Sequence, residues 1–169
     1  MLKDRKHNKT AAVEETLQLV TFLVGPEEYG LDISVITEVI RPLDITPLPH
    51  MPRFIRGVIN LRGTIIPVID LRSRFGLQTA GDATRKTRML IIRGAAQGLL
   101  GLVVDGVREV VRVPVAAIDP APDAAKSAGA DFIAGVVKTA GHLVILLDGG
   151  RILTREERAS LKEARDVPA

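Results

Sequence analysis

The side chains of this chain that could ligate a metal or act in catalysis have a spacing that favours no reaction. The three histidines are His7, His50 and His142. None has a second histidine or a carboxylate at the short intervals typical of metal ligands, and the chain has no cysteine. We therefore expect no metal site and no bound cofactor.

Two aspartates, Asp70 and Asp148, follow similar apolar stretches in the two halves of the chain. Two carboxylates that meet can divide general acid and general base roles. The simpler interpretation is that each caps a strand end or a turn, because both halves keep it. The sequence also lacks phosphate-binding, dinucleotide-binding and G-x-S-x-G motifs, and its serines have no plausible base partner. We predict that the protein is not an enzyme.

The most informative stretch is 54–71, where two runs rich in valine and isoleucine flank a polar tip at Asn60 and Arg62. The dipeptide Arg62-Gly63 between these runs predicts a β-hairpin, because glycine accepts the positive φ of a tight hairpin turn. Pro67 has no N–H to donate. We therefore expect the returning strand to be an edge strand, or to have a bulge at this proline.

The same stretch occurs twice. Phe132-Ile133-Ala134-Gly135-Val136 repeats Phe54-Ile55-Arg56-Gly57-Val58 at an offset of 78 residues, which holds as far as Gly141 and Asp148. Earlier segments match in the same order at smaller offsets, as expected after small loop insertions: Ile118 with Ile45, Glu109 with Glu38, Gly101 with Gly30, and Gly94 with Gly25. The sequence therefore predicts two copies of one β-rich half, about 17–77 and about 88–153.

Positions that differ between the copies are free of the demands of the fold. The first tip reads Asn60-Leu61-Arg62-Gly63 and the second reads Lys138-Thr139-Ala140-Gly141. An arginine beside an apolar leucine has the composition of a protein-contact surface, so we interpret the first tip as an interaction site rather than a solvated turn. Glu38 is a candidate partner for the arginine, whereas its counterpart Glu109 would face an alanine. The spacing leaves open whether this pair forms.

The composition is that of a globular protein whose halves depend on each other. With 169 residues and 46% hydrophobic content the chain can bury a core. Each half of about seventy residues would be marginal alone, so we expect the halves to share a core. Absence of cysteine fits a reducing compartment. No apolar run approaches the ~20 residues of a membrane span, and the N-terminus is no signal peptide. We expect a cytoplasmic protein without direct membrane insertion.

The charge distribution gives little support to nucleic-acid binding. The pI is about 9.5, but the formal net charge is only +3, with acids and bases interspersed. Arg85, Lys86 and Arg88 form a basic cluster, yet aromatic residues make up only 3% and there is no tryptophan. Nucleic-acid binders usually add aromatic platforms or a long basic stripe. A small barrel that binds RNA or another ligand remains the alternative from a different functional class.

Local patterns predict short strands and little helix, as in small β-barrels. Strands are expected over 17–24 and 29–33, repeated at 89–93 and 99–104. Ser34 is placed to cap a short helix through Glu38, with Ile36 and Val39 on one face. Residues 42–52 are punctuated by prolines and predicted to be extended.

The ends and linkers of the chain have simpler patterns. Residues 1–15 are polar and without periodicity, which predicts a flexible tail. Residues 78–86 are expected to be a loop between the copies, and 121–130 are either a loop or a helical turn. Thr154-Arg155-Glu156-Glu157 is a capping box, which predicts a charged C-terminal helix over 154–166.

The residues that carry the repeat also resemble a known family, the CheW coupling proteins of bacterial chemotaxis. The resemblance runs in order from about Leu17 to Leu153, and we identify 16–153 as a CheW-like domain. Its most specific part is the Asn-Leu-Arg-Gly tip followed by an Asp-Leu pair. The matching stretches are Tyr29-Gly30-Leu31-Asp32-Ile33, Glu38-Val39, 54–63, Pro67-Val68-Ile69-Asp70-Leu71 and 101–107.

The resemblance implies a mainly β fold of two SH3-like five-stranded barrels that share a hydrophobic interface. It also implies a non-enzymatic scaffold, located at receptor arrays on the inner membrane face. The implied partners are the regulatory domain of the histidine kinase CheA and the cytoplasmic tips of chemoreceptors. With no receiver, kinase or phosphotransfer segment in the sequence, we expect neither a CheV fusion nor a CheA fragment.

The resemblance places receptor binding in a groove between the barrels. The matching positions here are Ile36, Glu38, Gly57, Asn60, Leu61, Arg62 and Gly63, and we add Val39, beside them on the predicted face. The same adaptor role in a related pathway, such as twitching motility or second-messenger control, is the alternative that the sequence leaves open.

Overall fold

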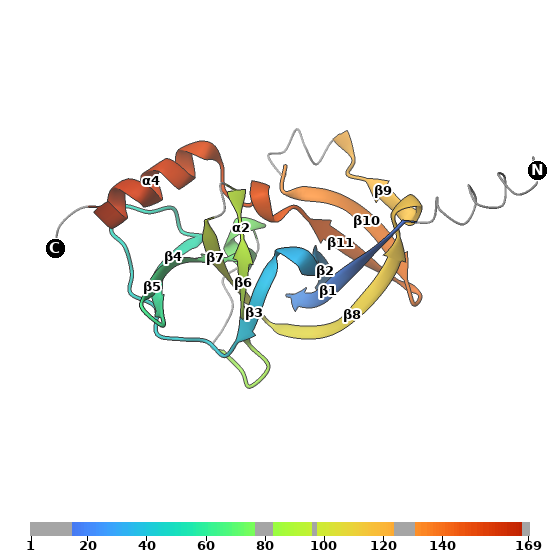
Figure 1. Ribbon diagram of the computed structural model, residues 1–169, viewed down its shortest axis with the longest axis horizontal. Helices are drawn as coiled ribbons and strands as arrows, with labels where there is room; N and C mark the ends of the chain where they lie inside the picture. Colours follow the sequence, from blue (N-terminus) through green and yellow to red (C-terminus); the bar gives the residue numbers. More distant parts are fainter. Residues whose placement is uncertain (1–14, 77–82, 96–97, 124–130, 167–169) are drawn as a thin grey trace, which may run out of the picture.

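The apolar runs of the sequence form two β-sheets, seen as two lobes side by side in Figure 1. The computed structural model describes residues 15–76, 83–95, 98–123 and 131–166. Residues 1–14 of the predicted tail, most of the loop over 78–86 and most of the segment 121–130 lie outside the described residues.

One lobe is a five-stranded sheet with the order β3-β6-β7-β5-β4. Its strands are β3 (Ile36–Ile40), β4 (Ile55–Leu61), β5 (Thr64–Asp70), β6 (Arg88–Arg93) and β7 (Leu99–Val104). The other lobe is a six-stranded sheet with the order β8-β1-β2-β11-β10-β9. Its strands are β1 (Thr16–Val24), β2 (Glu27–Asp32), β8 (Gly106–Pro114), β9 (Ile118–Pro120), β10 (Ile133–Thr139) and β11 (His142–Leu147).

The two copies exchange their first hairpins. The β1-β2 hairpin of the first copy joins strands of the second copy, and the β6-β7 hairpin of the second copy joins strands of the first. Two parallel pairings seal the exchange, and they are equivalent in the repeat: β5 with β7 through Val68 and Gly101, and β11 with β2 through Leu146 and Gly30. Neither copy therefore has a complete sheet of its own.

The fold is mainly β, as predicted. The two sheets differ by one short strand. The additional strand, β9, pairs with β10 near Gly135. In the first copy, Thr46 corresponds to Asp119 of β9. Thr46 makes an isolated bridge to Val58 of β4 and is not part of a longer strand. The same chain segment thus crosses both sheets at the same place.

The core consists of one shared cluster and a smaller cluster in each sheet. The smaller clusters are Leu19, Val113, Val137, Val144 and Leu146 in the six-stranded sheet, and Ile59, Ile66, Val68, Met89 and Ile91 in the five-stranded sheet. The shared cluster takes buried side chains from both sheets, including Phe22, Leu31, Ile69, Leu90 and Leu102. This confirms the prediction that the two halves share a core.

Aromatic rings and one arginine line the junction between the copies. Tyr29, Phe75 and Phe132 stack in sequence, with ring centroids 4.7 and 5.2 Å apart. The guanidinium of Arg74 lies 4.6 Å from the ring centroid of Phe54 and 5.3 Å from that of Phe132, its equivalent in the repeat. Burial, and secondarily the Glu27 carboxylate, raise the pKa of Tyr29. Its hydroxyl therefore ionises only at a higher pH than that of an ordinary tyrosine.

The short helices follow the strands. They are η1 (Ile33–Val35), α2 (Leu71–Arg74), η3 (Val115–Ala117), η4 (Gly149–Arg151) and α4 (Arg155–Asp166). The predicted capping box of α4 is confirmed: the Thr154 N–H donates to Glu157 Oε1 at 2.7 Å, and the Glu157 N–H donates to Thr154 Oγ1 at 3.1 Å. Leu161 of this helix is buried in the shared cluster.

The predicted helix from Ser34 to Glu38 is wrong. A single 3₁₀ turn, η1, is capped by Asp32, whose Oδ1 accepts from the Ser34 N–H at 2.9 Å. The chain then enters β3, because five residues gain more from pairing with β6 than from an isolated helical turn. Ile36 is half-buried against the shared cluster whereas Val39 is 44% exposed, so the two do not share a face.

The expectation of an edge strand at Pro67 is also wrong. Strand β5 lies between β4 and β7, and the bulge is in β4 between Ile55 and Gly57. Pro67 is tolerated because pairing with β7 begins only at the next residue, Val68. Its missing N–H therefore leaves no gap in that ladder.

Two equivalent glycines allow the close crossing of Thr46 and Asp119 over the sheets. A Cβ on Gly57 would lie 2.1 Å from the Thr46 carbonyl oxygen, and a Cβ on Gly135 would lie 2.5 Å from that of Asp119. Gly57 also has a φ of +141°, which side chains rarely adopt. These glycines keep the crossing segments against the strands.

We predict that Gly57→Ala destabilises the protein by about 2 kcal/mol or more, and that Gly135→Ala does so somewhat less. Gly76→Ala is the matched control, because Gly76 has a φ of +75° but no described residue lies within 4 Å of an added Cβ. Chemical denaturation measures all three. Equal losses for Gly57→Ala and Gly76→Ala would show that the close crossing is unimportant.

The exchange of hairpins predicts that neither copy folds alone. Fragments divided near Gly81 should lack cooperative thermal unfolding when separate, because each leaves the other's sheet incomplete. Mixing them should restore a cooperative transition, followed by circular dichroism. A cooperative transition in either isolated fragment would contradict the shared-core argument.

Candidate functional site

Both hairpin tips use the same turn geometry but different side chains. In the first tip φ is +52° at Arg62 and +89° at Gly63, and in the second it is +51° at Ala140 and +82° at Gly141. Positive φ at both central residues is the type I′ turn, which matches the twist of hairpin strands. The frame of the tip is therefore the same in both copies, and its chemistry differs.

Asn60 stabilises the first turn. Its Oδ1 accepts a hydrogen bond from the Gly63 N–H at 2.8 Å. The second copy has Lys138 at the equivalent place, and a lysine side chain has no acceptor. The turn thus forms without this hydrogen bond, and the Asn60 amide group keeps its N–H donors for another partner.

Arg62 and Glu38 form an ion pair that joins the tip to β3. Strands β3 and β4 are the two outer strands of the five-stranded sheet, so the pair bridges the seam where that sheet closes. The Arg62 side chain is 71% exposed and that of Glu38 is 31% exposed. Solvent screening limits the contribution of such a pair to stability to about 1 kcal/mol or less. Its main effect is to hold the guanidinium in a defined, accessible position.

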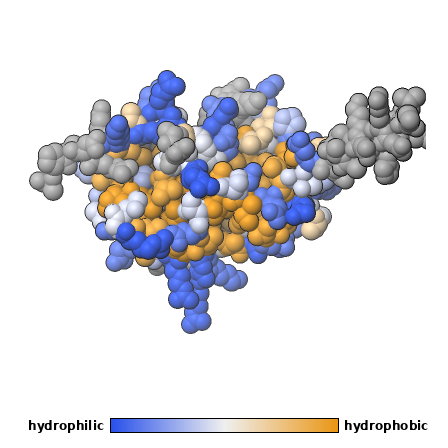
Figure 2. All heavy atoms as spheres, viewed as in Figure 1, coloured by the Kyte–Doolittle hydropathy of each residue, from blue (hydrophilic) through white to orange (hydrophobic). Residues whose placement is uncertain are grey.

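Exposed or partly exposed apolar side chains lie on the strands next to this ion pair. Leu61 is partly buried and packs against the small cluster of the five-stranded sheet. Val39 of β3 is 44% exposed and Ile65 of β5 is 40% exposed. Figure 2 shows hydrophobic residues in a band across both lobes, bordered by hydrophilic ones. Arginine is enriched in protein-contact surfaces, so an exposed arginine on strands that also expose aliphatic side chains is consistent with such a surface.

Two other predicted site residues serve the fold. Gly57 lies against the Thr46 backbone, and Ile36 packs on the shared cluster. The sequence-predicted set thus divides: Glu38 meets Arg62, Asn60 meets Gly63, Leu61 and Val39 add apolar surface, and Gly57 and Ile36 support the strands.

Asp70 and Asp148 are strand-end caps. Asp70 Oδ1 accepts from the Arg72 N–H at 3.0 Å and begins α2, and Asp148 Oδ1 accepts from the Gly150 N–H at 3.0 Å and begins η4. Each caps its own turn at the end of its own copy's last strand. The structural interpretation of these aspartates is confirmed.

The second tip brings His142 beside two carboxylates, which sequence reasoning missed. Glu28 of β2 and Glu109 of β8 lie near it, although both are far away along the chain. A search for ligands at short spacing cannot detect a grouping that depends on strand pairing.

None of the helices in the described part of the chain has the length and apolar character of a membrane span.

Comparison with known proteins agrees with this geometry. The CheW-like domain family matches residues 18–157. The chemotaxis protein CheW of Klebsiella aerogenes is 35% identical over 142 residues, 84% of each chain. Protein FrzA of Myxococcus xanthus is 34% identical over 163 residues, covering 94% of this chain and 98% of FrzA.

A solved structure is similar over nearly its whole length. The crystal structure of the scaffolding protein TtCheW from Thermoanaerobacter tengcongensis superposes with a TM-score of 0.74 at 35% identity, covering 85% of this chain and 96% of TtCheW. The two-sheet fold of this chain is thus one already seen in a scaffolding protein. This chain is a member of the CheW family, the scaffold proteins of chemotaxis signalling.

Proposed function

We propose that this protein couples the cytoplasmic tips of chemoreceptors to the regulatory domain of the histidine kinase CheA, without catalysing a reaction itself. Family membership supports the proposal, and one observation carries it. Two tips with the same turn geometry differ in side chains, and only the first presents an exposed arginine paired with Glu38. Because the turn forms with either set of side chains, the tip positions that differ are free to bind a partner protein.

We assign receptor contact to Glu38, Val39, Leu61 and Arg62, which combine charge with exposed or half-exposed apolar surface. Asn60 and Gly63 shape the turn that carries Arg62, and Ile36 and Gly57 position the strands beneath it. A guanidinium has five N–H donors and the ion pair engages only one of its terminal nitrogens, so Arg62 can bind a second acceptor.

A coupling protein needs a second surface, which we assign to the other lobe. Val110 of β8 is 54% exposed and Leu143 of β11 is 60% exposed, both on the six-stranded sheet. The first tip lies on the five-stranded sheet, so the two surfaces belong to different lobes (Figure 1). One chain can therefore contact a receptor and a kinase together. This function implies a cytoplasmic location at receptor arrays.

The similarity to FrzA favours a second candidate, the same adaptor role in a related chemosensory pathway. It differs only in which receptors and kinase are bound. The sparse aromatic residues and the modest net charge argue against RNA binding. Pull-down at moderate and high salt separates the classes, because nucleic-acid binding falls steeply with salt whereas an apolar protein interface persists.

We predict that exchanging the first tip for the second reduces receptor binding more than tenfold. The variant carries Asn60→Lys, Leu61→Thr and Arg62→Ala. Truncating apolar and arginine anchors commonly costs about 2 kcal/mol or more in binding. Stability should fall by only about 1–2 kcal/mol, from the lost Asn60–Gly63 hydrogen bond and the reduced packing of Leu61.

The matched control is the reciprocal exchange, Lys138→Asn, Thr139→Leu and Ala140→Arg, which should leave receptor binding unchanged. Thermal unfolding and receptor binding are measured on the same preparations. Unchanged binding in a folded first-tip variant would remove the receptor site from this tip.

We also predict that the purified protein raises CheA autophosphorylation in the presence of receptors and turns over no nucleotide alone. The reason is that no base–nucleophile pair or phosphate-binding motif occurs in the sequence. Radiolabelled phosphate transfer and ATP consumption measure the two quantities. ATP hydrolysis proportional to the concentration of this protein would contradict the proposal that it is a non-enzymatic adaptor.

A further inference from the structure

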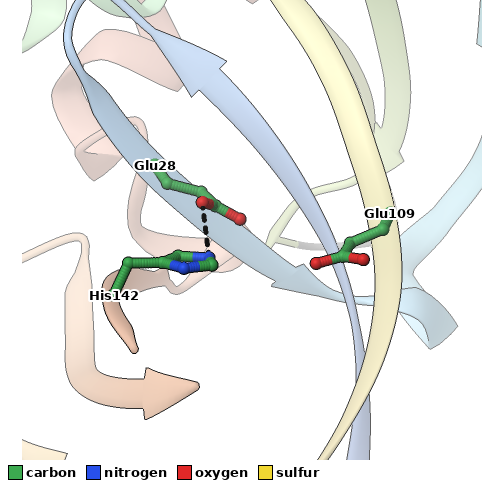
Figure 3. A group of neighbouring side chains, drawn as sticks. All are labelled: Glu28, Glu109 and His142. Carbon is green, nitrogen blue, oxygen red and sulfur yellow. Dashed lines mark ion pairs between the residues drawn. The ribbon is translucent and has the colours of Figure 1, made fainter. Parts of the chain in front are cut away.

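Three side chains that can ligate metals meet at one end of the six-stranded sheet. Glu28 comes from β2, Glu109 from β8 and His142 from the start of β11 (Figure 3). One ligand atom of each lies within 4.8 Å of those of the other two. The His142 Nε2 and the Glu28 Oε1 are 3.0 Å apart.

Glu28 is the unusual member, because a carboxylate is buried there with an oxygen left over. The residue is 7% exposed. Its Oε1 faces His142 and lies 3.5 Å from Nη1 of Arg108. Its Oε2 is buried and has no hydrogen-bond partner among the described residues. Leaving a buried charged oxygen unpartnered is costly, so the site is built for something more.

His142 has the complementary deficiency. Its Nε2 lies 3.0 Å from the Glu28 Oε1, but it is buried and makes no hydrogen bond with any described residue. A nitrogen lone pair and a carboxylate oxygen that face each other without bonding are both satisfied by a shared cation. Figure 3 shows the Glu109 carboxylate turned towards the same space.

A β-bulge aims these side chains. The pairing of β1 with β8 runs from Thr21–Glu109 to Phe22–Val107, which leaves Arg108 as the additional residue. In a regular strand, neighbouring side chains point to opposite faces, whereas a bulge allows Arg108 and Glu109 both to approach Glu28. The buried Thr21 hydroxyl donates to the Glu109 carbonyl at 3.3 Å, which holds the backbone there.

We propose that Glu28, Glu109 and His142 bind one divalent transition-metal cation, with Zn²⁺ the best match. An imidazole with carboxylates suits this class of ion better than Mg²⁺ or Ca²⁺, which prefer oxygen ligands alone. Bond lengths of ~2.0–2.2 Å place neighbouring ligand atoms roughly 3–3.5 Å apart, close to the present separation of His142 and Glu28. Glu109 is exposed and can rotate inward to complete the site.

Arg108 is the competitor for this position. Its guanidinium approaches the same carboxylate, but its side chain is 48% exposed and can move into solvent. A cation bound by Glu28 would be repelled by this like charge. The first copy lacks the equivalents of two of these ligands. In the first copy Glu38 occupies the place of Glu109 and pairs with Arg62, and Thr64 occupies the place of the histidine.

The expected effect of the metal is to join β2, β8 and β11, which come from both copies. A metal that binds the folded state but not the unfolded state raises the unfolding temperature. We expect the full chain in chelator-treated buffer to bind one Zn²⁺ by isothermal titration calorimetry, with a rise of a few degrees in thermal unfolding.

Variants test the assignment. His142→Ala and Glu109→Gln should each weaken Zn²⁺ binding roughly tenfold or more and remove the thermal shift, whereas Arg108→Ala should tighten binding. Glu38→Gln, the repeat-equivalent control, should bind as the parent does. Glu109 is exposed, so its variant keeps the test valid if His142→Ala fails to fold.

Three outcomes would overturn the proposal. They are no Zn²⁺ binding by the parent at millimolar metal, parental affinity in Glu109→Gln and His142→Ala, and equal stabilisation by Mg²⁺ or Ca²⁺. The second outcome would locate the bound metal at another histidine, such as His50.

Discussion

The reciprocal exchange of hairpins is the constraint on which the rest of the structure depends. Each sheet is completed by the first hairpin of the other copy, so the two copies cannot separate without breaking backbone pairing. The shared apolar cluster forms where the exchanged strands meet. Burial of this cluster, rather than surface charge, supplies the main stabilisation, because exposed ion pairs contribute little.

Duplication explains why the tips could diverge. The structural work of each copy is done by the same parts: a crossing segment held against a glycine, an aspartate cap, and a type I′ turn with glycine at its second position. With these three features present, neither copy needs a particular side chain at the remaining tip positions in order to fold. The first tip presents an arginine–glutamate pair, and the residue after the second turn presents an imidazole near two carboxylates.

Rigid placement of these groups matters for a scaffold. Arg62 is exposed, but its pairing with Glu38 and the Asn60 hydrogen bond restrict its orientation before any partner arrives. Preorganisation of this kind lowers the entropy cost of binding. The aromatic stack and the Arg74 guanidinium between Phe54 and Phe132 hold the two lobes in a fixed relation, so surfaces on different lobes keep their spacing.

The sequence by itself determined the features that depend on neighbouring residues. The duplication, the hairpin at Arg62-Gly63, the aspartate caps and the capping box of α4 were all predictable, because turns and caps rely on φ preferences and contacts within a few residues. The family was also recognisable, since its motif lies in such a turn.

Only the tertiary structure decided which distant residues meet. Residues 36–40 became a strand because β6 offered a partner, and Pro67 entered an inner strand because pairing with β7 begins after it. Arg62 finds Glu38 across 24 residues, and His142 finds Glu28 only because the exchange places β2 beside β11. Such contacts depend on strand order and register, which a local pattern does not encode.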